Sequence, residues 1–83
     1  MYSNSVYKIP RYNVYHNPSK KIIKEDIDIR ELVHLLFTMH EKNIIKVYPM
    51  DYGLSLLTIH VQELIKDVEA EGNIIISRTI SSI

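Results

Sequence analysis

The chain has 83 residues, of which 46% are hydrophobic, and its ten basic and ten acidic residues give a net charge of zero. This composition is typical of one folded domain with a modest core, and the absence of cysteine excludes disulfides, thiolate catalysis and cysteine-ligated zinc. No apolar run approaches the roughly 20 residues of a membrane helix, and the start, MYSNSVYKIP, lacks the apolar segment of a signal peptide. We therefore expect a soluble, intracellular (cytoplasmic) protein without a membrane partner.

The first 24 residues carry only positive charge. Residues 25–83 contain ten acids and five basic residues, whereas residues 1–24 contain no acid and five cations, which are Lys8, Arg11, Lys20, Lys21 and Lys24. This asymmetry predicts a basic, tyrosine-rich arm or edge strand over residues 1–24 and a compact domain over residues 25–83. The arm can bind nucleic acid, its tyrosines can stack on single-stranded bases, or it can fold onto the acidic body.

Within the arm, the segment VYKIPRYNVY (residues 6–15) is rich in β-branched and aromatic residues but contains Pro10. Because proline removes a backbone donor, we expect an edge strand or an extended arm, not a central strand. The segment HNPSKK (residues 16–21) combines asparagine, proline and serine and predicts a turn.

The clearest predicted helix covers residues 29–42. Asp28 and Glu31 have the spacing of a capping box, and Asn43 can end the helix in a left-handed conformation. Leu35 and Phe37 widen the apolar stripe beyond one face. A helix that is apolar over most of its circumference is typical of an interface, so we expect a homodimer.

The remaining chain predicts a strand over residues 44–48, a short turn over 50–53, a second helix over 55–71 and a strand over 73–77. Gly72 suits the position after the second helix, and RTISSI predicts fraying or a short further strand. The two strands are expected to pair beside each other over the helices. The predicted core residues are Leu32, Leu36, Val47, Leu57, Val61, Ile65, Val68 and Ile75.

One spacing in the second helix resembles that of winged helix-turn-helix domains. It consists of three apolar positions, a glycine and an apolar strand residue, namely Val61, Ile65, Val68, Gly72 and Ile74. The resemblance implies an α+β fold, with a small two- or three-helix core and a short β-sheet. It also implies a small DNA-binding regulatory protein, of the sort encoded by mobile or viral genomes, that binds two half-sites as a dimer.

The charge of the second helix opposes this implication. Its polar side carries one cation and four acids, which are Glu63, Asp67, Glu69 and Glu71. A helix in the major groove approaches negatively charged phosphates on both sides. Only Gln62 and Lys66, with Asn73 beyond the helix, suit the reading of base edges. If duplex DNA is bound, the five cations of the arm should supply most contacts. The alternative is a protein-binding inhibitor or adaptor whose four acids contact a basic protein surface, and a subunit of a larger assembly is a third reading.

The sequence does not predict catalysis. The histidines are scattered, the chelating motif HExxH does not occur, and the two glycines form no phosphate-binding loop. We therefore expect no enzyme activity, no catalytic residue, no metal site and no cofactor.

Overall fold

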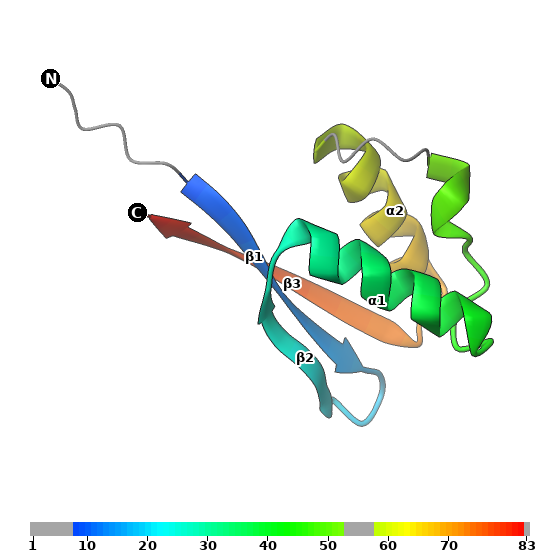
Figure 1. The fold of residues 1–83 in the computed structure, drawn as a ribbon. Helices are drawn as coiled ribbons and strands as arrows, with labels where there is room; N and C mark the ends of the chain where they lie inside the picture. Colours follow the sequence, from blue (N-terminus) through cyan, green and yellow to red (C-terminus); the bar gives the residue numbers. More distant parts are fainter. Residues whose placement is uncertain (1–7, 53–57, 83) are drawn as a thin grey trace, which may run out of the picture.

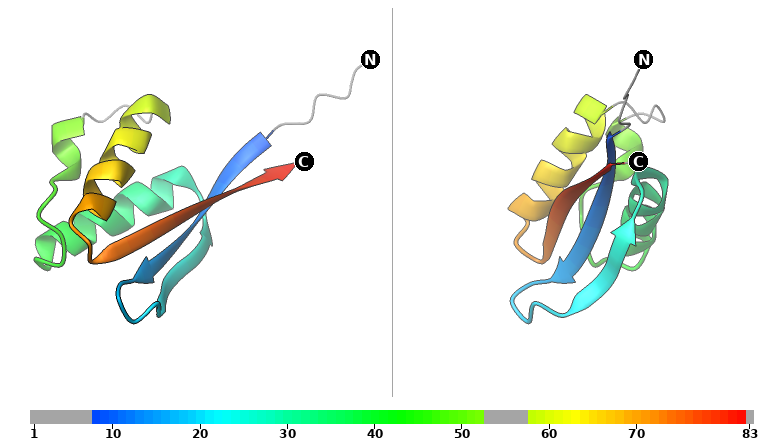
Figure 2. Two further views of the ribbon diagram at one scale, coloured as in Figure 1. Left: turned by 180° about the vertical axis from the view of Figure 1, so that it is seen from behind. Right: turned by 90° about the vertical axis from the view of Figure 1, so that its left-hand side faces the viewer.

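A computed structural model describes the backbone of residues 8–52 and 58–82, and side chains for 9–52 and 60–80. In chain order its elements are β1 (Lys8–His16), β2 (Ile22–Ile27), α1 (Ile29–Glu41), the 3₁₀ helix η1 (Pro49–Tyr52), α2 (Thr58–Ala70) and β3 (Ile74–Ser82). The strands form one antiparallel sheet in the order β2-β1-β3, and the helices lie on one of its faces (Figure 1, Figure 2). The expected α+β class is confirmed.

The predicted position of β1 at an edge is wrong, because β1 lies in the middle of the sheet. Its nine residues pair with β3, from Lys8 opposite Ser82 to His16 opposite Ile74. Tyr12 and Val14 point into the core and are almost completely buried. Residues 8–24, assigned to the arm, therefore share the sheet and the core with the rest of the chain.

The sheet accommodates Pro10 because no strand needs its missing donor. The amide of Ile76 points away from β1 and donates to a carboxylate oxygen of Glu69 at 3.1 Å. Backbone groups alternate sides along an antiparallel strand. The amide and carbonyl of Ile80, four residues after Ile76, therefore also point away from β1. Pro10 is opposite Ile80, and its nitrogen therefore faces the other edge, where pairing with β2 begins only at Tyr12.

The predicted turn between residues 16 and 21 is confirmed, but it is followed by a strand that the sequence pattern did not indicate. Two backbone hydrogen bonds close the turn, from His16 to Lys21 (2.8 Å) and from Lys20 to His16 (2.7 Å). β2 then runs along β1 with two register irregularities. Of its six residues only Ile27 is buried, which explains why no apolar alternation marks this strand.

Helix α1 confirms its prediction to within one residue. The amide of Glu31 donates to the Asp28 carboxylate at 2.8 Å, and the Glu31 side chain accepts from the Asp28 amide at 3.4 Å. Both arms of the capping box are thus present. Asn43 has φ of 62°, as expected for a residue that ends a helix in the left-handed region.

The predicted strand over residues 44–48 is not formed, and these residues do not pair with β3. The Glu71 carboxylate takes the place of a neighbouring strand. It accepts from the Lys46 amide at 2.9 and 3.1 Å and from the Val47 amide at 2.8 Å. Backbone donors that a sheet would have satisfied are bound instead by one side chain at the end of α2.

Helix α2 is observed over Thr58–Ala70; the start of the predicted range, residues 55–57, lies outside the described part of the chain. Gly72 follows with φ of +86°, in the conformation that favours glycine. The expected end of β3 at residue 77 is wrong. Because β1 offers a partner along its whole length, the strand continues without a break to Ser82.

The core lies between the sheet and the two helices. Its buried residues are Tyr12, Val14, Ile27, Leu32, Leu36, Met39, Ile45, Val61, Leu64, Val68, Ile74 and Ile76. Four of the eight predicted core residues, Leu32, Leu36, Val61 and Val68, are among them, and Leu57 lies outside the described residues.

The other predicted core residues, Val47, Ile65 and Ile75, are only half-buried. Val47 and Ile65 pack against the edge of the core. Ile75 is on the opposite face of β3 from Ile74 and Ile76, because successive strand residues point to opposite sides. A run of three isoleucines cannot show by itself which face is the inner one.

Candidate nucleic-acid interface

The cations predicted to bind nucleic acid fall on the β1–β2 hairpin. Lys20 and Lys21 lie in its turn, Lys24 lies on β2, and all three side chains are exposed. No ion pair holds any of them within the described part of the chain. Lys8 begins β1, but its side chain is outside the described residues. Three ammonium groups on one hairpin are therefore available to an anionic partner.

Arg11 differs from these lysines because its guanidinium group forms an ion pair within the protein. Its Nε donates to Asp26 Oδ1 at 3.0 Å, and its Nη2 donates to the backbone carbonyl of Asp26. The side-chain oxygen of Asn13 accepts from the Asp26 amide at 2.8 Å, and Asp26 has a positive φ of 54°. Arg11 thus fixes an irregular position of β2 across from β1, and the structure favours a structural role for it.

The turn that carries Lys20 and Lys21 is attached to the body of the protein. Asn17 donates through its backbone amide to Asn73 (2.9 Å) and through its side-chain amide to Gly72 (2.8 Å). Ser19 and His16 share a hydrogen bond of 2.8 Å. These contacts place the basic turn beside the corner between α2 and β3.

The acids of α2 are less free than the sequence suggests. Asp67 accepts a hydrogen bond from the Tyr52 hydroxyl, Glu69 accepts from the Ile76 amide, and Glu71 accepts from the two amides of residues 46 and 47. Glu63 has no hydrogen bond or ion pair within the described residues. Three of the four acids therefore stabilise the fold, and the four do not form a free acidic face.

Gln62 and Lys66, the two candidate base-reading residues of α2, are both exposed. They lie on the outer side of the helix, near Glu63 in sequence. The structure does not bring them together with the lysines of the hairpin by any hydrogen bond or ion pair among the described residues. The candidate set is thus divided between two elements.

The contact between Tyr52 and Asp67 changes the chemistry of the tyrosine. The hydrogen bond to the Asp67 carboxylate, together with burial and the nearby negative charges, raises the pKa of Tyr52 to about 12. The neutral hydroxyl is the form that donates, so the contact persists through neutral pH. This tyrosine joins η1 to α2.

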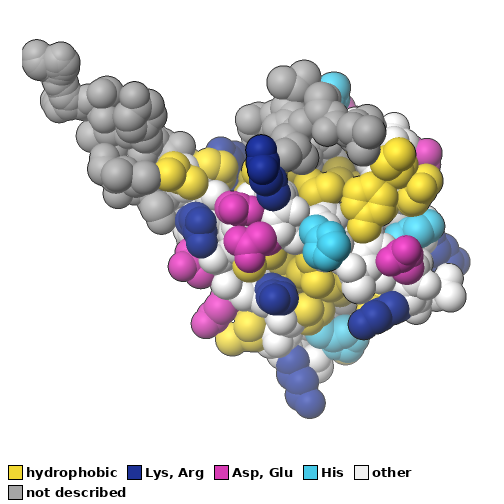
Figure 3. Space-filling view, in the orientation of Figure 1, with side chains coloured by type: hydrophobic (Ala, Val, Ile, Leu, Met, Phe, Trp, Pro, Cys, Tyr) yellow, Lys and Arg dark blue, Asp and Glu magenta, His cyan; other side chains and the backbone are white. Residues whose placement is uncertain are grey.

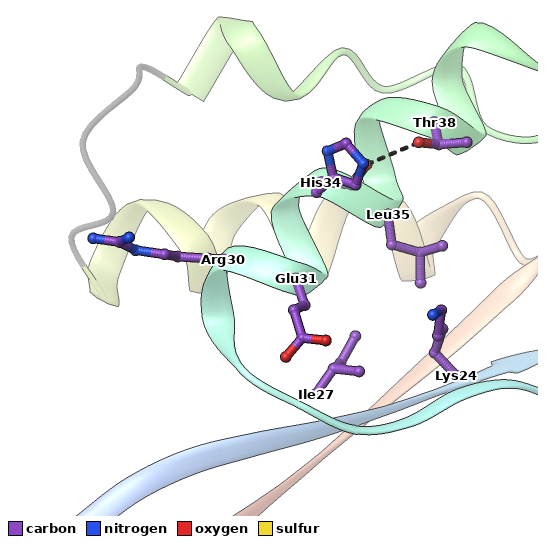
Figure 4. Close-up of a pocket in the computed structure, with 7 residues that line it drawn as sticks. All are labelled: Lys24, Ile27, Arg30, Glu31, His34, Leu35 and Thr38. Carbon is purple, nitrogen blue, oxygen red and sulfur yellow. Dashed lines mark hydrogen bonds between the residues drawn. The ribbon is translucent and has the colours of Figure 1, made fainter.

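A groove of about 450 Å³ separates β2 from α1 (Figure 4). Ile27 and Leu35 supply apolar surface, and the remaining lining residues are Lys24, Arg30, Glu31, His34 and Thr38. Figure 3 shows exposed hydrophobic side chains among basic, acidic and histidine side chains on this side of the molecule. Arg30 was not a predicted site residue. It lines the same groove as Lys24 only because β2 lies along α1, which no local sequence signal shows.

The two apolar residues that motivated the expected homodimer have intramolecular contacts. Leu35 lines the groove and packs against the core. Phe37 meets Tyr48 edge-on, with ring centroids 6.1 Å apart, and Tyr48 also stacks on His40 at 4.8 Å. Both side chains are half-buried, and the homodimer stays a prediction.

Among the described residues, no group of three or more histidine or acidic side chains is arranged to hold a metal ion. No helix in the described ranges has the length and apolar character needed to cross a membrane. The chain matches no protein-family model, and neither the curated proteins nor the solved structures include a significant match to it.

Proposed function

We propose that this protein is a small DNA-binding regulator that contacts the phosphates of duplex DNA with its β1–β2 hairpin. The observation that carries the proposal is the set of three exposed lysines, Lys20, Lys21 and Lys24, none of which is ion-paired within the described chain. Lysines on an exposed hairpin can approach phosphates without desolvating the body of the protein. Their displacement of counterions makes such binding favourable at low salt.

Helix α2 is a secondary element in this proposal. Glu63 remains free to repel phosphate, and only Gln62 and Lys66 can reach base edges. The order of α2, Gly72 and β3 supports the resemblance to winged helix-turn-helix domains. The cations, however, lie on a hairpin that precedes α1 in sequence.

The test is a titration of generic duplex DNA over a range of salt concentrations. Lys20→Gln combined with Lys21→Gln should flatten the log–log salt dependence by roughly 0.9 for each phosphate that is no longer neutralised. The matched control is Lys42→Gln combined with Lys46→Gln, which removes two exposed charges away from the hairpin and should change the slope little. Absence of salt-dependent binding by the intact protein at low ionic strength would contradict the proposal.

A protein-binding adaptor is the second candidate, and the groove between β2 and α1 favours it. The groove has the size and partly apolar lining of ligand sites in general. The expected basic protein partner would meet Glu63, with less help from Asp67, Glu69 and Glu71 because these carboxylates accept internal hydrogen bonds. Replacing Glu63 by Gln distinguishes the candidates, since it should strengthen binding to DNA and weaken binding to a basic protein surface.

A further inference from the structure

The sheet has open edges, and most of them carry a feature that prevents pairing with another strand. The outer edge of β2 includes Lys24, Glu25 and Asp26 and has register irregularities. The part of β1 that extends past β2 contains Pro10, whose nitrogen faces the open side. Charges, irregular register and proline are the usual means by which proteins protect a strand edge.

The outer edge of β3 is protected over only part of its length. Near α2, the Glu69 carboxylate accepts a hydrogen bond from the Ile76 amide at 3.1 Å. Beyond this point, alternation along the strand directs the backbone groups of Arg78, Ile80 and Ser82 away from β1. No described segment pairs with them.

This stretch projects from the body, and Ile80 is its one apolar residue. The β1–β3 ribbon continues past the helices (Figure 1, Figure 2). The Ile80 side chain is 54% exposed, and its partner across the ribbon is Pro10. A strand edge with unpaired backbone groups and an exposed isoleucine, and without a proline, is a template for another strand.

We propose that a second copy of this chain binds here, with residues 78–82 of the two β3 strands paired antiparallel about a two-fold axis at Ile80. Ile80 then exchanges both backbone hydrogen bonds with the partner's Ile80, and Arg78 pairs with the partner's Ser82. The two sheets become one continuous sheet.

The register follows from charge and from the groups that remain free. Centring the axis on Arg78 would place two like charges directly opposite each other and would require the Ile76 amide, which Glu69 already holds. Centring it on Thr79 would set Ser82 opposite the partner's Ile76, whose amide Glu69 also holds. Only centring on Ile80 engages Arg78, Ile80 and Ser82 together through free backbone groups, and it separates the two arginines. A second copy suits this stretch because the same edge satisfies itself across a two-fold axis, as in an isologous interface.

Single cysteines test the register, because the natural chain has none. Directly opposite residues of a hydrogen-bonded pair are about 5.5 Å apart at Cα, which is within the range of a disulfide. Ile80→Cys should therefore form a disulfide-linked dimer under mild oxidation. Thr79→Cys is the matched control, since its nearest copy is displaced by two residues and should not cross-link. Arg78→Cys should cross-link with Ser82→Cys when the two variants are mixed, but not with itself.

A second measurement tests the dimer without cysteine. Light scattering across a concentration series should show the wild-type mass rising toward twice that of the monomer. Ile80→Pro removes an amide that β1 does not use, so the variant should stay folded by circular dichroism and remain monomeric, whereas Ile80→Thr retains the amide and should still dimerise. A wild-type chain that is monomeric throughout, or equal cross-linking of Thr79→Cys and Ile80→Cys, would overturn the proposal. Neither result depends on DNA binding.

Discussion

The β1–β2 hairpin and helix α2 carry charges of opposite sign and use them differently. On the hairpin, Lys20, Lys21 and Lys24 are exposed and unpaired within the described chain. On and just after α2, the carboxylates of Asp67, Glu69 and Glu71 accept hydrogen bonds from other segments. The charge counted along a sequence therefore does not equal the charge that a surface offers to a partner.

The chemical reason is the difference between a carboxylate and an ammonium group as a structural support. A carboxylate has two oxygens that can accept from backbone amides, and loops and strand edges leave such amides unpaired. An ammonium group can only donate, and the exposed turn of the hairpin leaves it in water. The acids of α2 thus hold the loop after α1 and the edge of β3.

The largest expected effect tests whether the hairpin and α2 share one core. Ile27→Ala in β2 and Leu64→Ala in α2 remove side chains that are 4% and 2% exposed. Each should lower the free energy of unfolding by about 2–5 kcal/mol, because apolar burial is reduced and a cavity remains. Chemical denaturation of both variants measures the change.

Ile22→Ala is the matched control for β2, because Ile22 is 58% exposed. It should change the free energy of unfolding by less than about 0.5 kcal/mol. If Ile27→Ala also left the free energy of unfolding unchanged, the hairpin would not share a core with α2.

A smaller effect is expected from the acid that holds the loop after α1. Glu71→Ala leaves the amides of Lys46 and Val47 without their acceptor and should cost about 1–2 kcal/mol of unfolding free energy. Glu63→Ala also removes one negative charge but breaks no hydrogen bond within the described residues. It should leave the free energy of unfolding nearly unchanged. Equal losses in the two variants, measured by urea denaturation, would show that charge alone matters.

The smallest expected effect is a pH dependence at Tyr52. Its pKa is raised to about 12 from 10.0, so the folded state favours the neutral hydroxyl. The resulting stabilisation is present below pH 10 and is lost as the pH rises from 10 toward 12. Tyr52→Phe should therefore be less stable than the wild type at neutral pH, and this difference should shrink in that interval. Thermal unfolding at several pH values measures it, and a constant difference would contradict the assignment.

Features set by neighbours in sequence were predictable without a fold. The capping box of Asp28 and Glu31, the left-handed Asn43 and the glycine after α2 all depend on contacts within a few residues. The turn at residues 16–21 belongs to the same class. The clustering of cations near the N-terminus was also visible in the sequence, but the hairpin that carries Lys20, Lys21 and Lys24 required the pairing of β2 with β1.

Features set by distant partners were decided only by the tertiary structure. Residues 44–48 have the composition of a strand, but Glu71 binds two of their amides and no strand lies beside them. Pro10 occupies the central strand because its nitrogen faces a side that β2 does not reach. Ile74 and Ile76, not Ile75, enter the core because pairing with β1 fixes the face of β3. A sequence lists which donors, acceptors and apolar groups a segment contains, but their partners are chosen by segments up to tens of residues away.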